Sequence, residues 1–183
     1  MKNISTLVGA RPQLIKAAAI SRIIKSEFRD VFNENIIHTG QHYDKNMSEI
    51  FFEDLDIPLP NHNMNISSSK HGEMTGKMII AFESYLLENK TDYVLLYGDT
   101  NSTLAGMLAA IKLGIPVAHV EAGLRSFNMK MPEEMNRILV DRLSTVLFCP
   151  TLQAINNLSN EGINAGVHQV GDVMFDVALF YKD

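Results

Sequence analysis

The sequence predicts an α/β fold, a doubly wound parallel sheet of the Rossmann-like kind. Short apolar runs recur along the chain, and longer segments with the spacing of amphipathic helices separate them. The runs follow one another at about the spacing of a βαβ unit, roughly 30 residues or somewhat less. Two of them lead to a carboxylate, at Asp99 and Glu121. Ligands of such sheets bind beyond the carboxyl ends of the strands, so both acids stand where chemistry is expected.

The composition is that of a globular protein, with 183 residues of which 46% are hydrophobic and 20% charged. The net charge of −5 argues against a broad nucleic-acid-binding surface. The single cysteine, Cys149, excludes a disulfide framework within the chain, and it is expected to be a buried strand residue. No apolar segment reaches membrane-spanning length, and the first one is too short for a signal peptide. The expected location is the cytoplasm, with neither a membrane nor a nucleic acid as partner.

The first predicted strand, Ile4–Val8, runs into a glycine and then into a helix that begins at Pro12. Proline suits the first turn of a helix, because its missing N–H would have no partner there. The free backbone N–H groups at such a helix start, together with Arg11 and Lys16, suggest a phosphate site. The alternative is an ordinary strand–helix turn with two surface cations.

The second predicted strand, Ile36–Thr39, leads into a polar loop that contains Gln41 and His42. His42 is a candidate contact for phosphate or sugar, although a lone loop histidine is more often structural or solvated. The elements predicted next are a helix over Asn46–Leu55, a polar loop over Met64–His71 and a helix over much of Glu73–Asn89.

The central strands, Tyr93–Tyr97 and Val117–Val120, lead to Asp99 and Glu121, and a helix that ends at Gly114 connects them. A further helix starts at Pro132, with Glu133 and Glu134 in its first turn. Its predicted buried face consists of Met135, Ile138, Leu139 and Leu143. The last predicted elements are a strand at Val146–Cys149, a helix from Thr151 to Gly162, a strand at Val167–Val170 and a helix over Val173–Tyr181.

Three acidic groups near one sheet edge suit general acid–base catalysis, because burial and mutual repulsion can keep one carboxyl protonated while another accepts a proton. Two of them have structural alternatives: Asp99 as a helix cap, and Glu133 as the i,i+4 partner of Arg137. Glu121 directly follows a buried strand and has little access to water unless a cavity lies there. The residues alone favour a nucleotide or phosphate ligand with acid–base chemistry over a structural role.

A metal site and a serine nucleophile are weaker interpretations. His119 lies within a strand and is expected in the core, on the same face as Glu121, where it can form a hydrogen bond. No cysteine pair supports a metal, and no Gly-x-Ser-x-Gly elbow is present. No metal is expected.

Five motifs stand in order along the chain: GARPQLIK at Gly9–Lys16, TGQHYD at Thr39–Asp44, GDTNSTLAG at Gly98–Gly106, HVEAGLRS at His119–Ser126 and PEEMNR at Pro132–Arg137. Together they resemble the non-hydrolysing UDP-N-acetylglucosamine 2-epimerase family. Any one of the motifs is a weak signal, whereas five in the family's order are specific.

The resemblance implies the first half of a two-domain protein like the GT-B glycosyltransferases, with the active site between two Rossmann-like domains. It implies inversion at C2 of a UDP-N-acetylamino sugar, of the UDP-N-acetylglucosamine type, by anti elimination of UDP and its re-addition through a 2-acetamidoglucal. No NAD or other cofactor is needed. Asp99, Glu121 and Glu133 correspond to the family's acidic catalytic residues. Our hypothesis for their roles makes Asp99 and Glu121 the C2 acid–base pair, with Glu133 assisting. The implied contacts of the UDP-sugar substrate are Arg11, Lys16, Gln41, His42 and Arg125.

The family's chain is about twice as long, and its second half supplies a catalytic histidine and much of the uridine and pyrophosphate pocket. We therefore expect residues 1–172 to form the first domain and residues 173–183 to begin an interdomain helix or linker. The second domain is absent from this chain, which is expected to be inactive alone. The full-length protein is expected to be a homodimer.

Several functional alternatives stay open. The forms GARPQ and TGQHYD look more like the subgroup that acts on modified sugars, such as UDP-2,3-diacetamido-glucuronic acid. A hydrolysing epimerase and a non-catalytic nucleotide-sugar-binding domain are the others. A glycosyltransferase half-domain is disfavoured, because GT-B transferases usually place the donor-nucleotide contacts on their second domain.

Overall fold

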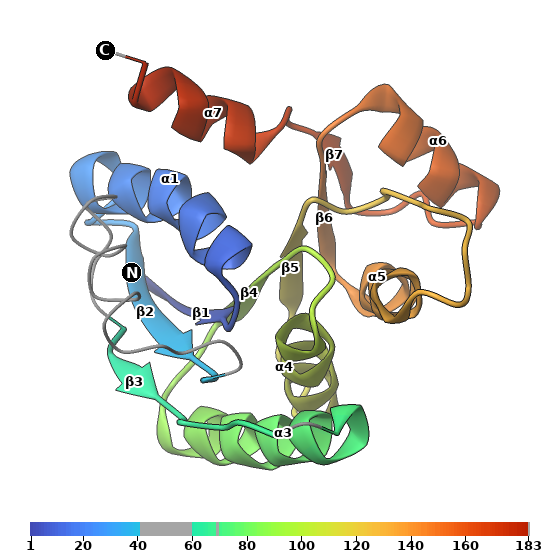
Figure 1. Ribbon diagram of the computed structural model, residues 1–183. Helices are drawn as coiled ribbons and strands as arrows, with labels where there is room; N and C mark the ends of the chain where they lie inside the picture. The colour runs from blue at the N-terminus through green and yellow to red at the C-terminus, as the bar shows by residue number, and fades with distance from the viewer. Residues whose placement is uncertain (41–59, 69, 183) are drawn as a thin grey trace.

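Parallel strands form a single sheet in the order β3-β2-β1-β4-β5-β6-β7 (Figure 1). The computed structural model describes residues 1–40, 60–68 and 70–182. The strands are β1 Lys2–Val8, β2 Phe32–His38, β3 His62–Asn63, β4 Tyr93–Tyr97, β5 Val117–Val120, β6 Val146–Cys149 and β7 Val167–Gln169. Because each pairing is parallel, the predicted doubly wound α/β class is confirmed.

The helices connect the strands much as the sequence predicts. They are α1 Arg11–Glu27, α3 His71–Glu88, α4 Asn101–Lys112, α5 Pro132–Leu143, α6 Leu152–Asn160 and α7 Val173–Phe180. The helix predicted over Asn46–Leu55 lies outside the described residues. The two-residue strand β3 has no apolar run of its own and was not predicted.

The strand order places a topological switch point between β1 and β4. The chain passes outward from β1 to β2 and β3, and then returns to the other side of β1 as β4. In open α/β sheets the crevice at such a switch point, beyond the carboxyl ends of the strands, is the usual ligand site. The acids that follow β4 and β5 lie at this carboxyl edge of the sheet.

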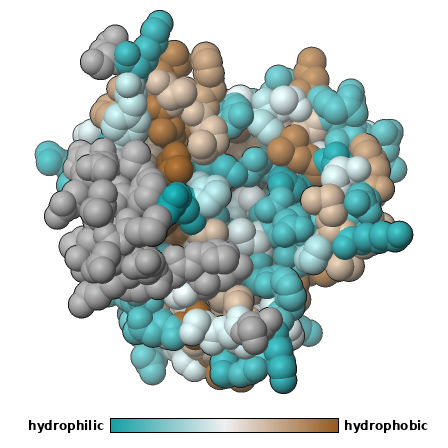
Figure 2. Space-filling view, viewed as in Figure 1, coloured by the Kyte–Doolittle hydropathy of each residue, from teal (hydrophilic) through white to brown (hydrophobic). Residues whose placement is uncertain are grey.

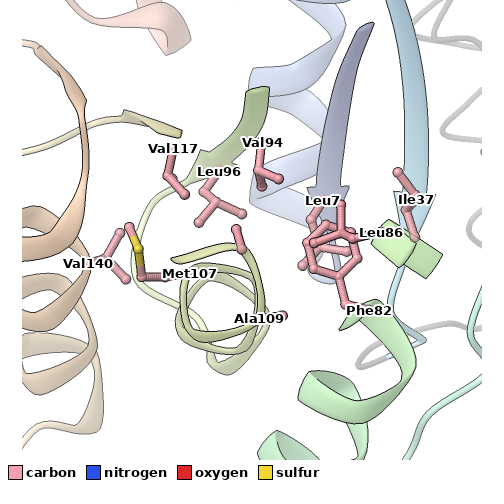
Figure 3. Packing of buried hydrophobic residues seen from close by; sticks show 11 residues of the cluster. Leu7, Ile37, Phe82, Leu86, Val94, Leu96, Met107, Ala109, Val117 and Val140 are labelled. Carbon is pink, nitrogen blue, oxygen red and sulfur yellow. The ribbon is translucent and has the colours of Figure 1, made fainter. Parts of the chain in front are cut away.

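Helices cover both faces of the sheet. On one face α1 packs Leu14, Ala17 and Ala18 against β4 and β5. On the other face lie α3, α4 and α5 (Figure 1). Figure 3 shows this second core, with Leu7, Ile37, Phe82, Leu86, Val94, Leu96, Met107, Ala109, Val117 and Val140.

The buried face of α5 differs from the prediction. Met135, Leu139 and Leu143 are exposed, and Ile138 is only half-buried. The buried residues are Glu134, Asn136, Arg137, Val140 and Asp141. The polar face of this helix turns inward because its charged side chains find partners at the sheet edge, which offset the cost of their burial.

Cys149 is buried at the end of β6, as predicted. Burial, with the nearby Asp141 carboxylate, raises the pKa of the Cys149 thiol to about 11. The residue packs with Leu147, Ala154 and Leu158 where α6 meets the sheet. Its role is therefore that of a small apolar core residue.

Apolar surface gathers over α7 and α1 at the upper edge of the molecule (Figure 2). Phe175 and Leu179 of α7 are more than half exposed, at 62% and 51%. Arg22 of α1 holds this helix, since its guanidinium lies 3.8 Å from the centroid of the Phe180 ring and donates to the Tyr181 hydroxyl at 2.9 Å. None of the helices in the described ranges combines the length and the apolar character needed to cross a membrane.

The half-buried carboxyl of Glu34 gives a testable pH dependence. Glu34 of β2 accepts a hydrogen bond from Thr6 Oγ1 at 2.5 Å. Burial raises the pKa of Glu34, and the hydrogen bond only partly opposes this shift. A raised folded-state pKa means that the neutral form stabilises the fold below the unfolded-state pKa, and that this stability is lost as the pH rises through the folded-state value.

The variant Glu34→Gln is therefore expected to gain stability relative to the wild type as the pH rises from 4 to 7, because its neutral amide does not ionise. Urea unfolding at several pH values measures the difference. Glu88→Gln, at an exposed position of α3, controls for the change in net charge. An unfolding free-energy difference that does not vary with pH would contradict the assignment.

Candidate functional site

Asp99 and Glu121 meet at the carboxyl edge of the sheet, through a shared partner on α5. Arg137 forms an ion pair with the Asp99 carboxylate and also donates to the backbone carbonyl of Glu121 at 2.6 Å. Asn136 adds a hydrogen bond to the Asp99 carbonyl at 2.8 Å. The segments that follow β4 and β5 are therefore both bonded to the beginning of α5. The two acids lie near one another at this edge, as expected for a parallel sheet.

Lys16 joins these acids from the other face of the sheet. Its ammonium forms an ion pair with the Glu121 carboxylate, and the side chains are 10% and 22% exposed respectively. Gly98 lies against the same pair, since a Cβ at this position would lie 3.2 Å from Glu121 Oε2. Each of the two carboxylates is therefore matched by one nearly buried cation, and both retain a path to solvent.

The backbone of Glu121 is left-handed, with φ +71°. Residues with a side chain resist this conformation by roughly 1–2 kcal/mol. The expectation that His119 and Glu121 share a face is wrong for this reason. His119 contacts Asp141 of α5, whereas the turn redirects Glu121 to Lys16 of α1 on the opposite face. Strained backbone of this kind is concentrated at functional sites.

The turn after β1 does not offer the free donors expected of a phosphate loop. Gln13 Oε1 accepts from the backbone N–H groups of Gly9 and Ala10, at 2.8 and 3.1 Å. Its amide nitrogen donates to the Tyr97 carbonyl at 2.7 Å. The glutamine thus binds the start of α1 to the end of β4. Arg11, the first residue of α1, has an exposed side chain at this turn.

The two acids at the start of α5 have different surroundings. Glu133 is exposed, and its side chain forms no hydrogen bond or ion pair with another described residue. Glu134 is buried, and accepts from the backbone N–H groups of Ser126 and Phe127 at 2.8 and 3.0 Å. Burial alone would raise the pKa of Glu134, but these hydrogen bonds and the charge of Arg125 hold it below its usual value. Glu134 orders the loop before α5.

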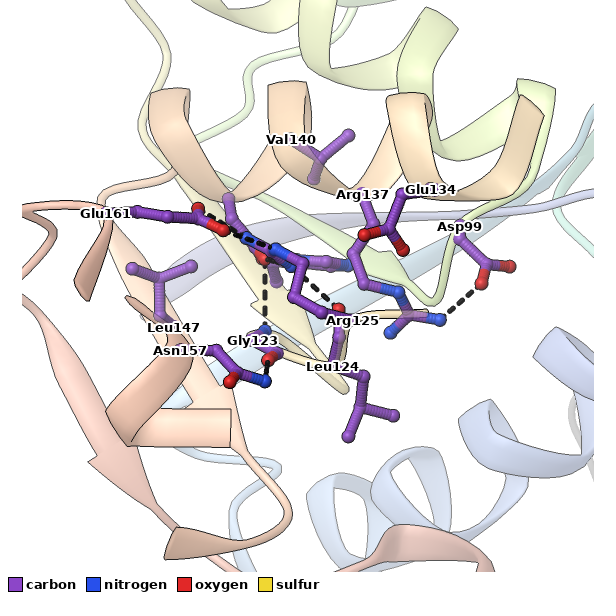
Figure 4. Close-up of polar contacts among 12 residues, drawn as sticks. Asp99, Gly123, Leu124, Arg125, Glu134, Arg137, Val140, Leu147, Asn157 and Glu161 are labelled. Carbon is purple, nitrogen blue, oxygen red and sulfur yellow. Dashed lines mark hydrogen bonds and ion pairs between the residues drawn. The ribbon is translucent and has the colours of Figure 1, made fainter. Parts of the chain in front are cut away.

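The Arg125 side chain is buried and forms its hydrogen bonds with other residues of the protein. It is 1% exposed and forms a two-point contact with Glu161, at 2.7 and 2.8 Å. It also donates to Asp141 and to the Leu124 carbonyl, each at 2.7 Å (Figure 4). Burial alone would lower the pKa of Arg125, but the two carboxylates raise it above its usual value. The geometry gives it a positioning role.

His119 is buried, as predicted, and hydrogen-bonded on both sides. Its Nδ1 lies 2.7 Å from Asp141 Oδ1, and its Nε2 lies 2.7 Å from the Gly98 carbonyl. Burial alone would raise the pKa of Asp141, but its contacts with His119 and Arg125 lower it. Within the described ranges no group of three or more His, Cys, Asp or Glu side chains is arranged to hold a metal ion.

The other expected contacts, Gln41 and His42, lie outside the described residues. Sequence reasoning missed Asp141 and Gln13, and it considered Arg137 only as a partner of Glu133. The sequence does contain a signal for Arg137 and Asp141, since these charged residues are four positions apart and therefore lie on the same face of one helix. The prediction of the buried face used only the apolar residues of that helix and therefore missed them.

Relatives of this chain among known proteins have the names of UDP-sugar 2-epimerases. A family model described as UDP-N-acetylglucosamine 2-epimerase matches residues 25–183. The UDP-2,3-diacetamido-2,3-dideoxy-D-glucuronate 2-epimerase of Pseudomonas aeruginosa is 57% identical over 181 residues, which cover 97% of this chain and 51% of that protein. A UDP-N-acetylglucosamine 2-epimerase homolog of Methanococcus maripaludis is 58% identical over 176 residues, covering 96% and 48%.

Solved structures agree with these relatives. The crystal structure of Methanocaldococcus jannaschii UDP-GlcNAc 2-epimerase, in complex with UDP-GlcNAc and UDP, superposes with a TM-score of 0.93 at 50% identity. The match covers 97% of this chain and 49% of that one. The chain thus spans about half the length of the relatives it matches.

Proposed function

Because the chain belongs to the UDP-N-acetylglucosamine 2-epimerase family, we propose that it forms the acid–base wall of an enzyme that inverts C2 of a UDP-N-acetylamino sugar. The observation that carries the proposal is the placement of Asp99 and Glu121, two partly exposed carboxylates at the switch-point edge of the sheet. Proton transfer on either side of one carbon requires two such groups.

The proposed reaction has two balanced halves. In the first, one carboxylate takes the proton from C2, the electron pair of that C–H bond forms the C1=C2 double bond, and the C1–O bond breaks with release of UDP. In the second, UDP adds back at C1 while a carboxylic acid delivers a proton to the opposite face of C2. The product differs from the substrate only in the configuration at C2.

We assign the two proton transfers to Asp99 and Glu121. Glu133, which is exposed on the first turn of α5, is proposed to assist once a ligand covers it. Lys16 and Arg137 hold the two carboxylates in place and limit the repulsion between them. Substrate contacts are proposed for Arg11 and Lys16 on α1 and for Gln41 and His42, which follow β2 in the sequence. Arg125 is proposed only to position other groups.

The architecture proposed for the whole protein follows from the length of its relatives. Residues 1–172 form the first domain, and residues 173–183 begin the connection to a second one. The contact of Arg22 with Phe180 and Tyr181 supports this, because it fixes the start of the connection on α1. The second domain closes the site, and the complete protein is a cytoplasmic homodimer.

Solvent exchange at C2 tests the proposed activity. The product of the full reading frame that encodes these residues is incubated with UDP-N-acetylglucosamine in deuterated water, with no acceptor present. We expect deuterium at C2, a second C2 epimer and no net loss of the UDP-sugar, whereas the 183-residue chain alone gives no turnover. Release of free N-acetylmannosamine would indicate a hydrolysing epimerase instead, and an absence of exchange would refute the proposal.

A second candidate substrate is UDP-2,3-diacetamido-2,3-dideoxy-D-glucuronate, which the name of the Pseudomonas aeruginosa relative specifies. The same exchange experiment run with both UDP-sugars separates the candidates. The better substrate is the one with the higher kcat/KM, because this ratio reports the difference in transition-state binding.

A further inference from the structure

Four charged side chains form a continuous chain beneath the proposed site, which we call the buried ion chain because all of them except the partly exposed Glu161 are buried. It runs from Glu161 at the end of α6 through Arg125 and Asp141 to His119 in β5, with contacts of 2.7–2.8 Å. The side chains of His119, Asp141 and Arg125 are at most 1% exposed. Acidic and basic groups alternate along it.

The hydrogen-bond partners of His119 indicate which of its ring nitrogens carry a hydrogen. The Gly98 carbonyl can only accept, so Nε2 of His119 carries a hydrogen. Asp141 Oδ2 accepts from the Gly123 N–H at 3.0 Å and from Arg125, so the carboxylate is ionised. Nδ1 of His119 therefore donates as well. Both ring nitrogens carry hydrogens, and His119 is an imidazolium paired with Asp141.

The buried ion chain reaches the two turns that carry the acids. Gly98, which accepts from His119, immediately precedes Asp99, and Gly123, which donates to Asp141, lies two residues after Glu121. Both turns contain left-handed backbone, with φ +61° at Gly98, +71° at Glu121 and +80° at Gly123. Such turns keep their shape only where the surrounding contacts determine it.

We propose that His119 and Asp141 are positioning residues that set the separation of the Asp99 and Glu121 carboxylates by joining the two turns from below. The inference rests on the proposed acid–base function of these two carboxylates. A single imidazolium–carboxylate pair spans the ends of neighbouring strands β4 and β5, so movement of one turn is transmitted to the other. Acid–base catalysis on one carbon tolerates little such movement, since a displacement of about 1 Å can cost 10²-fold in rate.

The buried ion chain contains a matched control position for a substitution of Asp141. Asp141→Asn removes the charge that holds His119 and loosens the link to both turns. Glu161→Gln removes a charge of the same ion chain at its far end, and leaves the contacts with Gly98 and Gly123 in place. Both variants are expected to lose stability. Only Asp141→Asn is expected to change the positions of the Asp99 and Glu121 carboxylates.

Kinetics of the full reading-frame product give the first readout. We expect Asp141→Asn and His119→Gln to lower kcat for C2 exchange by about 10- to 100-fold with KM nearly unchanged, and Glu161→Gln to leave kcat within about twofold. Equal losses in all three variants, or an unchanged kcat in Asp141→Asn, would overturn the proposal.

Nuclear magnetic resonance of the 183-residue chain gives a second readout that does not depend on turnover. Nitrogen-15 shifts of the wild-type protein are expected to show both His119 ring nitrogens protonated. Backbone amide shifts of Gly98, Asp99 and Glu121 are expected to change more in Asp141→Asn than in Glu161→Gln. A neutral His119 or equal shift changes would refute positioning, whereas an enzyme that shows no exchange despite the expected shifts would refute only the proposed function.

Discussion

Replacing Gly123 by alanine is expected to lower the free energy of unfolding by about 2–5 kcal/mol, the sum of two effects. The left-handed backbone, with φ +80°, disfavours a side chain by roughly 1–2 kcal/mol. The added Cβ would also lie 2.4 Å from the carbonyl oxygen of Ala154 in α6, and forcing apart such packing costs about 1–3 kcal/mol. Urea unfolding with an unchanged m value measures the loss.

Gly114→Ala is the matched control for this prediction. Gly114 has φ +70°, but no atom lies within 4 Å of a Cβ placed there. Its replacement is expected to cost only the backbone contribution, roughly 1–2 kcal/mol. Equal losses at both positions would show that the approach of α6 to the Glu121 turn contributes nothing to stability.

Replacing Glu121 by glutamine in the full reading-frame product is expected to reduce C2 exchange by about 10²–10⁴-fold, the usual contribution of a general acid or base. The amide keeps the shape of the side chain but can neither accept nor deliver the proton. The change also removes the charge that pairs with nearly buried Lys16, so the variant loses stability as well.

A double variant separates these two consequences. Adding Lys16→Met to Glu121→Gln removes the unpaired ammonium, and is expected to recover part of the unfolding free energy without recovering exchange. Initial rates and urea unfolding of the single and double variants measure both quantities. Unchanged exchange in Glu121→Gln would show that Glu121 is not one of the two acid–base residues.

The strands could be predicted because a parallel sheet is buried on both faces. Its strands therefore appear as continuous apolar runs, as in Val117–Val120, whose residues are all buried. The two acids follow such strands, so their meeting at one edge could be expected from topology alone. The helix ends were also well marked, for example by Thr151, which accepts from the Ala154 N–H at 3.1 Å.

Other features depend on contacts that local patterns do not contain. The inward polar face of α5 exists because Asp99 and His119 supply partners for Arg137 and Asp141 from other elements. The direction of Glu121 depends on one left-handed residue, which neither strand alternation nor residue type predicts. These departures all lie at the proposed site, where local rules are most often broken.

The glutamine at the start of α1 has a consequence for how such a protein can diversify. Gln13 already occupies the Gly9 and Ala10 donors with which a Rossmann-type turn would grip a diphosphate. Anchoring of the nucleotide therefore falls to other groups.

Under the proposed function, Asp99 is held by Arg137 and Asn136 of α5. Lys16 instead has two tasks, since it pairs with Glu121 and is also a proposed substrate contact. A change of nucleotide or sugar made through Arg11 would leave the proton-transfer geometry intact, and one made through Lys16 would not.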